Sequence, residues 1–190
     1  NTNAIDEPIN AVLRIELDGS DLEWNGTWGN LVRGLEIRAD GTTVRGLVIN
    51  GFENENIAID GASGNHIEGN FIGTDADGSQ VFERRLQHGV FVNGVAGNTI
   101  GGTTADARNV ISGNVNGVTI SGADAKNNKV QGNYIGTDKD GTRPADGPDL
   151  GNTENGVQIR DGSENTIGGL TTDSAGNPTL PGTLPGNIIS

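Results

Sequence analysis

Apolar residues alternate with polar ones in short phrases that recur along the chain, and each phrase ends at a turn. The first kind of phrase has Ile, Val or Phe around every second position and is followed by glycine or Asp-Gly. It occupies 57–61, 90–94, 118–122 and 157–162. An apolar spacing of two is typical of strands, and glycine at such short intervals disfavours helix. The pattern therefore predicts an all-β chain of short strands and tight turns.

Two further phrases follow each of these, and the last comes in two alternating kinds. A short Asn-led phrase occupies 65–67, 98–100, 128–130 and 165–167. Next comes either Gly-Asn-Phe/Tyr-Ile-Gly-Thr-Asp (69–75 and 132–138, repeat A) or Asn-Val/Ile-Ile-Ser (109–112 and 187–190, repeat B). Phrases in an A, B, A, B order indicate a solenoid whose equivalent strands stack. Looser copies lie upstream at 35–37 and 44–52, and 11–17 resembles a first strand.

Stacking accounts for the residues that the repeats use. A very short strand cannot bury its apolar face alone, whereas stacked copies share one core. Asparagines at equivalent turns are expected to form ladders of amide hydrogen bonds. Glycines supply positive φ at the bends, so a larger residue at Gly69, Gly113 or Gly132 should be poorly tolerated.

These features predict a right-handed parallel β-helix of about eight or nine coils. The whole chain, 1–190, is expected to form one domain, with 1–33 as N-terminal cap or first coil and 34–190 as repeat coils. The alternative, a glycine-rich antiparallel sandwich, would not repeat near-identical phrases at long distances.

Charge and composition narrow the class of partner. The chain has 12 basic and 25 acidic residues, a net charge of −13, which disfavours binding to nucleic acid or to an anionic membrane. It has no cysteine, so it has neither disulfides nor thiolate metal sites. Apolar runs stay short of the ~18 residues that suggest a membrane span. We therefore expect neither nucleic-acid binding nor membrane insertion.

The phrases at 98–102, 108–114 and 132–138 resemble the repeats of large bacterial secreted and cell-surface proteins of the right-handed parallel β-helix superfamily. The pectate lyases are its best-known members, and the resemblance covers roughly 35–190. It implies an extracellular or cell-surface location in a bacterium, and a chain that is part of a longer repeat array. The same repeats serve lyases, hydrolases, epimerases, adhesins and passive stalks, so the resemblance carries the fold rather than the function.

Two acidic loops in the A repeats are candidate calcium sites. Each is an Asp-x-Asp-Gly sequence, whose carboxylates could converge on a hard cation. The predicted ligands are Asp75, Asp77, Glu83, Asp138 and Asp140. Asp-Gly is also an ordinary turn pair, so a purely structural turn is the alternative.

The few aromatic residues suggest where a sugar ring could stack. Trp24 and Trp28 lie close together, and either bind carbohydrate or cap the apolar end of the first coil. Phe71 and Tyr134 occupy equivalent positions of the two A repeats, and either mark a sugar-binding face or pack under a loop.

Polar strand-end residues give no catalytic phrase. Asp60, Asp161, Arg160 and Arg45 do not match the motifs of the related hydrolases or epimerases, and are read as turn and surface residues. His66 is predicted to face outward from a strand, and His88 to lie in a loop. We expect a non-catalytic structural or adhesive domain that binds polysaccharide or another surface protein. A polysaccharide lyase or epimerase and a passive spacer are the alternatives.

Overall fold

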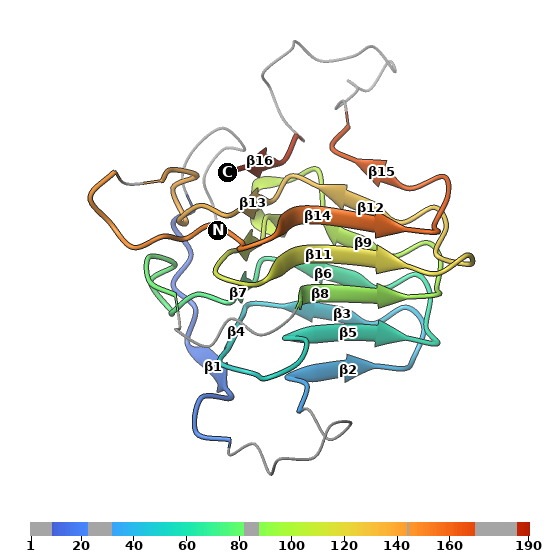
Figure 1. Ribbon diagram of the computed structural model, residues 1–190, viewed down its shortest axis with the longest axis horizontal. Helices are drawn as coiled ribbons and strands as arrows, with labels where there is room; N and C mark the ends of the chain where they lie inside the picture. The colour runs from blue at the N-terminus through green and yellow to red at the C-terminus, as the bar shows by residue number, and fades with distance from the viewer. Residues whose placement is uncertain (1–8, 23–31, 82–87, 144, 170–185) are drawn as a thin grey trace.

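Three parallel sheets, stacked strand on strand, make up the molecule (Figure 1). The computed structural model describes residues 9–22, 32–81, 88–143, 145–169 and 186–190. Sheet A contains β1 (Ile15–Asp18), β4 (Leu47–Asn50), β7 (Phe71–Ile72), β10 (Val110–Ile111), β13 (Tyr134–Ile135) and β16 (Ile188–Ile189). Sheet B contains β2 (Leu35–Ile37), β5 (Ile57–Asp60), β8 (His88–Asn93), β11 (Asn116–Ser121) and β14 (Asn155–Arg160). Sheet C contains β3 (Thr43–Arg45), β6 (His66–Glu68), β9 (Thr99–Gly101), β12 (Lys129–Gln131) and β15 (Thr166–Ile167).

The chain visits sheets B, C and A in turn, and each strand pairs in parallel with the strand three elements later. This is a parallel β-helix, as the repeats predict. Connections between parallel strands are right-handed in nearly all proteins, so we still expect the coil to be right-handed. The predicted number of coils was wrong, because in the part of the chain that the structure describes β2 to β16 make five turns, preceded by β1. Three phrases form a single coil, and loops lengthen a turn from 22 residues (Leu35 to Ile57) to 39 (Val118 to Val157).

The core is a set of Ile and Val columns that run the length of the coil. In sheet C, Val44, Ile67, Ile100 and Val130 lie in register on successive strands, and the last three are fully buried. Ile167, the next member, is 39% exposed in the last described coil. Burial of these side chains therefore depends on a coil on each side, and is worth ~1.5–3 kcal/mol per fully buried residue.

Asparagine ladders join the coils at their corners, as predicted, and two of them run through four asparagines each. At the first corner, Oδ1 of Asn98 accepts hydrogen bonds from the backbone N and from Nδ2 of Asn65, both at 3.0 Å. Asn98 donates in the same way to Asn128, and Asn128 to Asn165. The second ladder runs through Asn70, Asn109, Asn133 and Asn187.

Glycines at the bends are required by both conformation and space. Gly69, Gly113 and Gly132 have φ of 65°, 73° and 68°. A Cβ at Gly132 would lie 2.3 Å from the carbonyl oxygen of Gly102, and one at Gly113 would lie 2.5 Å from Val81 Cγ1. Both findings agree with the predicted intolerance of larger residues.

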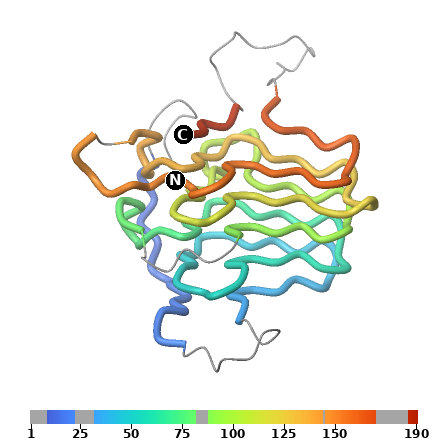
Figure 2. Tube along the Cα trace, viewed as in Figure 1, coloured from blue at the N-terminus to red at the C-terminus, as the bar shows by residue number. Residues whose placement is uncertain are grey.

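The N-terminal segment departs from the predicted strand at 11–17. Regular strand begins only at Ile15, and residues 9–13 run instead along the outer face of sheet A (Figure 2). Ile9, Ala11 and Leu13 pack on an apolar stripe of outward side chains from β4, β7, β10 and β13. We call residues 9–13 the strap. It deviates from the strand pattern because its alternate apolar residues find a second apolar surface outside the coil.

Candidate functional site

The two acidic loops of the A repeats hold their leading carboxylates in hydrogen bonds to their own backbone. Oδ1 of Asp75 accepts from the N–H groups of Ser79 and Gln80 at 2.9 and 3.1 Å. Oδ1 of Asp138 accepts from the N–H groups of Asp140 and Thr142 at 2.9 and 2.8 Å. These carboxylates therefore serve as the turn-forming groups of their loops.

The two loops also lie against each other. The N–H of Lys139 donates to the carbonyl oxygen of Gly78 at 3.1 Å, and Lys139 Nζ pairs with Asp140 at 3.1 Å. Within the part of the chain that the structure describes, no group of three or more His, Cys, Asp or Glu side chains could hold a metal ion. Glu83 lies outside the described residues. Calcium binding by Asp75, Asp77, Glu83, Asp138 and Asp140 stays a prediction.

Phe71 and Tyr134 belong to one outward column of sheet A, separated by Val110. They are 1% and 4% exposed, because the strap covers this column. Their rings therefore pack beneath the strap in this structure, and sugar binding by Phe71 and Tyr134 stays a prediction. Trp24 and Trp28 lie outside the described residues.

The buried guanidinium of Arg108 lies beside Tyr134. It donates through Nε to the carbonyl oxygen of Gly132 at 3.1 Å and through Nη1 to the Tyr134 hydroxyl at 2.8 Å. Its Cζ lies 4.2 Å from the centre of the Tyr134 ring, a cation–π contact. This arrangement fixes the Tyr134 ring beneath the strap.

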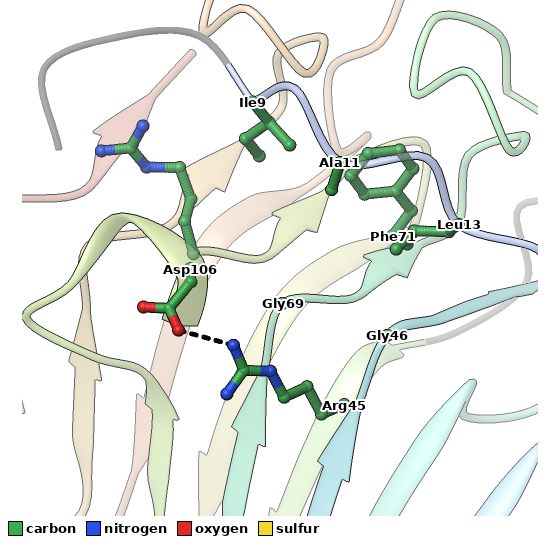
Figure 3. Close-up of a pocket in the computed structure, with 9 residues that line it drawn as sticks. Ile9, Ala11, Leu13, Arg45, Gly46, Gly69, Phe71 and Asp106 are labelled. Atoms are coloured by element: carbon green, nitrogen blue, oxygen red, sulfur yellow. Dashed lines mark hydrogen bonds and ion pairs between the residues drawn. The ribbon is translucent and has the colours of Figure 1, made fainter. Parts of the chain in front are cut away.

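A cavity of about 80 Å³ opens between the strap and the coils (Figure 3). Its polar wall is the ion pair of Arg45 and Asp106, which point toward each other, and Arg45 also contacts Glu68 at 3.1 Å. A hydrogen bond from Thr104, followed by Arg45, lowers the pKa of the Asp106 carboxyl. Arg108 is the third charged residue of the lining, and Ile9, Ala11, Leu13 and Phe71 supply the apolar wall. It is too small for a sugar ring with its hydroxyl groups and is best described as a packing defect under the strap.

The outer face of sheet B carries a different kind of surface. Beside charged residues such as Asp60 and Arg160, it carries a set of uncharged side chains on three adjacent strands, which can form hydrogen bonds and include the Phe91 ring. We call this set the sheet B strip: His88 and Phe91 on β8, Asn116 and Thr119 on β11, and Asn155 and Gln158 on β14.

Hydrogen bonds and stacking order the sheet B strip. The Thr119 hydroxyl lies 2.9 Å from Nδ1 of His88, and the imidazole stacks on Phe91 with ring centres 5.1 Å apart and planes 15° apart. Nδ2 of Asn155 donates to Oδ1 of Asn116 at 2.8 Å. Because Thr119 is only 1% exposed while His88 and Phe91 are half-buried, the two rings form the accessible part of this cluster.

The charge state of His88 follows from its surroundings. Burial lowers the pKa of the imidazole below its ordinary value. Arg160 adds to that effect, whereas Glu55 and Glu154 oppose it. His88 is therefore neutral at pH 7, and the sheet B strip consists of uncharged side chains with Glu154, which accepts from Nδ2 of Asn116 at 3.3 Å, and Arg160 around it.

The predicted position of His88 in a loop was wrong, since it is the first residue of β8. A recurring phrase could have shown this: His88-Gly89-Val90 aligns with Asn-Gly-Val at 116–118 and at 155–157. In each phrase the glycine has no room for a Cβ; at Gly89 it would lie 2.6 Å from the carbonyl oxygen of Gly117. His66 is exposed on β6, as expected.

The strand-end residues considered for catalysis are spread over the molecule. Asp60 and Arg160 share one row of sheet B, with Asn93 and Ser121 between them. Three strand spacings of ~4.8 Å separate them by ~14 Å. Arg45 lies on sheet C, and Asp161 follows β14 with a φ of 62°. The coil does not bring these four side chains together.

No family model, no curated protein and no solved structure matches this chain. Among the described residues no helix is long and apolar enough to cross a membrane.

Proposed function

We propose that this chain is a non-catalytic, structural or adhesive β-helix domain that binds a neutral polysaccharide on the sheet B strip. The observation that carries the proposal is the accessible part of the strip, the half-buried rings of His88 and Phe91 with the half-buried amide side chains of Asn155 and Gln158. Sugar hydroxyl groups pair with neutral donors and acceptors of this kind, and the apolar face of a sugar ring packs on an aromatic ring.

The coil supports this role by fixing the spacing of the side chains. Neighbouring strands lie ~4.8 Å apart, so residues in register form a straight row that cannot spread. The asparagine ladders and the buried Ile and Val columns fix the coils, and with them the backbone that carries this row. A preorganised surface loses little conformational entropy when it binds an extended chain.

Charge favours a neutral ligand over an acidic one. The protein carries a net charge of −13, which repels a polyanion, and the sheet B strip offers no cation to offset this while His88 is neutral. An acidic polysaccharide would need a bridging cation such as calcium. A bacterial cell-surface or secreted protein that contacts neutral wall or matrix glycans fits this chemistry.

The enzyme alternative, a polysaccharide lyase or epimerase, would use acidic and basic groups on adjacent coils. The acidic and basic groups that the structure brings together on adjacent coils, Arg45, Glu68 and Asp106, are paired with one another. Asp60 and Arg160 share a row of sheet B but lie three strand spacings, ~14 Å, apart. The observed geometry therefore favours binding over turnover. A passive spacer, with no ligand, is the remaining alternative.

One assay separates the three. The domain is incubated with neutral and acidic polysaccharides, with and without calcium, and both binding and the absorbance of unsaturated products are followed. We expect binding of a neutral polysaccharide without products. Product formation would establish the enzyme, and the absence of both would leave the spacer.

Matched variants tie binding to the sheet B strip. Phe91→Ala removes the ring on which a sugar would stack and should weaken binding about fivefold or more, if a sugar ring gains as much as a base does on an aromatic side chain, on the order of 1–3 kcal/mol. Lys129→Ala, an exposed outward position on sheet C, is the control and should bind as the unchanged protein does. Equal weakening in both variants would place the ligand elsewhere.

A further inference from the structure

Three buried side-chain oxygens among the described residues have no hydrogen-bond partner, and one belongs to the sheet B strip. They are Oδ1 of Asn50, Oδ1 of Asn56 and Oε1 of Gln158. A buried acceptor without a donor costs ~1–3 kcal/mol, so an arrangement that supplies a donor is favoured whenever it becomes accessible. Because Oε1 of Gln158 is shielded from solvent, that donor has to come from the protein.

The hydroxyl of Thr119 is the neighbouring candidate donor. Thr119 and Gln158 are register partners on β11 and β14, and both face outward from sheet B. Side chains of directly opposed residues lie within reach of each other across a strand pair. In the structure, however, the Thr119 hydroxyl lies beside Nδ1 of His88 at 2.9 Å and does not reach Gln158.

The protonation state of His88 determines where this hydroxyl proton points. A neutral imidazole with its proton on Nε2 accepts at Nδ1, so Thr119 donates to it. When Nδ1 takes a proton from solvent it becomes a donor, and Thr119 Oγ1 can then only accept from it. The hydroxyl proton must turn to another acceptor, and Oε1 of the register partner Gln158 is an acceptor without a donor.

We propose that His88, Thr119 and Gln158 form a proton-operated switch across β8, β11 and β14 of the sheet B strip. Above the switching pH, Thr119 donates to a neutral His88 and Gln158 is unpaired. Below it, a cationic His88 donates to Thr119, whose hydroxyl donates to Gln158 after that side chain has turned toward it. The strip changes from uncharged to positively charged, and Gln158 becomes fixed.

The charged groups around His88 set the position of this switch. Glu55, just before β5, and Glu154, just before β14, favour the cation, whereas burial and Arg160 on β14 favour the neutral ring. Glu55 is itself paired with Arg33 at 2.7 Å, which weakens its pull on the imidazole. The switch should therefore act below the ordinary histidine value of 6.5, in mildly acidic solution.

The functional meaning of this inference rests on the proposed binding face. An uncharged strip suits a neutral polysaccharide, while a cationic one tolerates an acidic saccharide that the net charge otherwise repels. The switch itself is a property of the free protein. It is tested without ligand, so failure of polysaccharide binding and failure of the switch give different results.

The test is a nuclear magnetic resonance titration of the isotope-labelled chain between pH 8 and pH 5. At pH 8 the ring nitrogen shifts of His88 should show Nδ1 without a proton. On acidification the side-chain amide of Gln158 should shift with the same midpoint as the His88 ring. His66, exposed on β6, is the internal control, and its titration should leave Gln158 unaffected.

Two substitutions of Thr119 distinguish the switch from a general effect of charge. Thr119→Val removes the hydroxyl at nearly constant shape, so His88 should still titrate while Gln158 no longer follows it. Thr119→Ser restores the hydroxyl and should restore the response. The proposal is overturned if Gln158 ignores the His88 titration, if it follows it equally in the valine variant, or if Nδ1 carries the proton at pH 8.

Discussion

Replacement of Asn98 by alanine tests the asparagine ladder at the first corner, where Asn65, Asn98, Asn128 and Asn165 join successive coils. Asn98 is fully buried, and its Oδ1 accepts from both the backbone N and Nδ2 of Asn65 at 3.0 Å. Its Nδ2 donates to Oδ1 of Asn128 at 3.1 Å and to the carbonyl oxygen of Ala96 at 3.3 Å. Alanine leaves the two donors of Asn65 without this acceptor, in a corner that water does not reach.

The magnitude follows from those two donors. Each buried group left without a partner costs ~1–3 kcal/mol, so Asn98→Ala should lower the free energy of unfolding by ~2–6 kcal/mol. Asn165 accepts the same pair of bonds from Asn128, but in a half-buried position where water can replace it. Asn165→Ala should therefore cost clearly less than Asn98→Ala.

Urea unfolding followed by circular dichroism measures these differences. The midpoint should fall strongly for Asn98→Ala, with the slope compared as a check that the same surface unfolds. Asn93→Ala is the control, since Asn93 is exposed and makes one hydrogen bond, to Asp60 at 3.2 Å, so its substitution should change stability by less than ~0.5 kcal/mol. If Asn98→Ala and Asn93→Ala cost the same, the ladder does not hold the coils together.

Three further predictions concern strain, the strap and pH. Glu164 has a φ of 59° at the position that Gly64 and Gly97 occupy in earlier coils. Glu164→Gly should therefore raise the free energy of unfolding by ~1 kcal/mol and with it the melting temperature. A lower melting temperature would contradict this. Leu13→Asp puts a charge on the covered apolar stripe and should lower the melting temperature, whereas Val12→Asp, at a 75% exposed position of the strap, should not; equal effects would show that the strap is not packed. Folding lowers the pKa of His88, so on acidification the unfolded chain binds a proton at this residue before the folded chain does. The free energy of unfolding should therefore be full above pH 6.5 and fall as the pH drops through the lowered folded pKa. His88→Gln should flatten this part of the plot of melting temperature against pH.

The fold could be predicted from the sequence because each sequence feature that specifies it recurs from coil to coil. Alternating Ile and Val, glycines at the bends and asparagines at fixed corners all recur in order, so several independent signals give the same parallel β-helix. The number of coils could not be obtained this way. Loops such as that between β13 and β14 lengthen single turns, and three phrases that read as separate units close one coil.

The sheet B strip was harder to foresee, because its residues differ from coil to coil. Phe91, Thr119 and Gln158 are register partners, yet they share no chemical type, and only pairing of the strands brings them together. The strap was predicted wrongly for a different reason. Its apolar alternation is that of a strand, but the segment lies outside the coil, where it covers Phe71 and Tyr134.

Mapping of a neutral oligosaccharide onto the protein by nuclear magnetic resonance tests the central claim most directly. A soluble fragment of the neutral polysaccharide that binds best is added to the isotope-labelled domain, and the shifts of assigned groups are followed. The account predicts changes at His88, Phe91 and Gln158 on the sheet B strip, no change at Lys129 on sheet C, and an oligosaccharide that stays intact. Changes centred on the loops of the A repeats, or cleavage of the sugar, would contradict it.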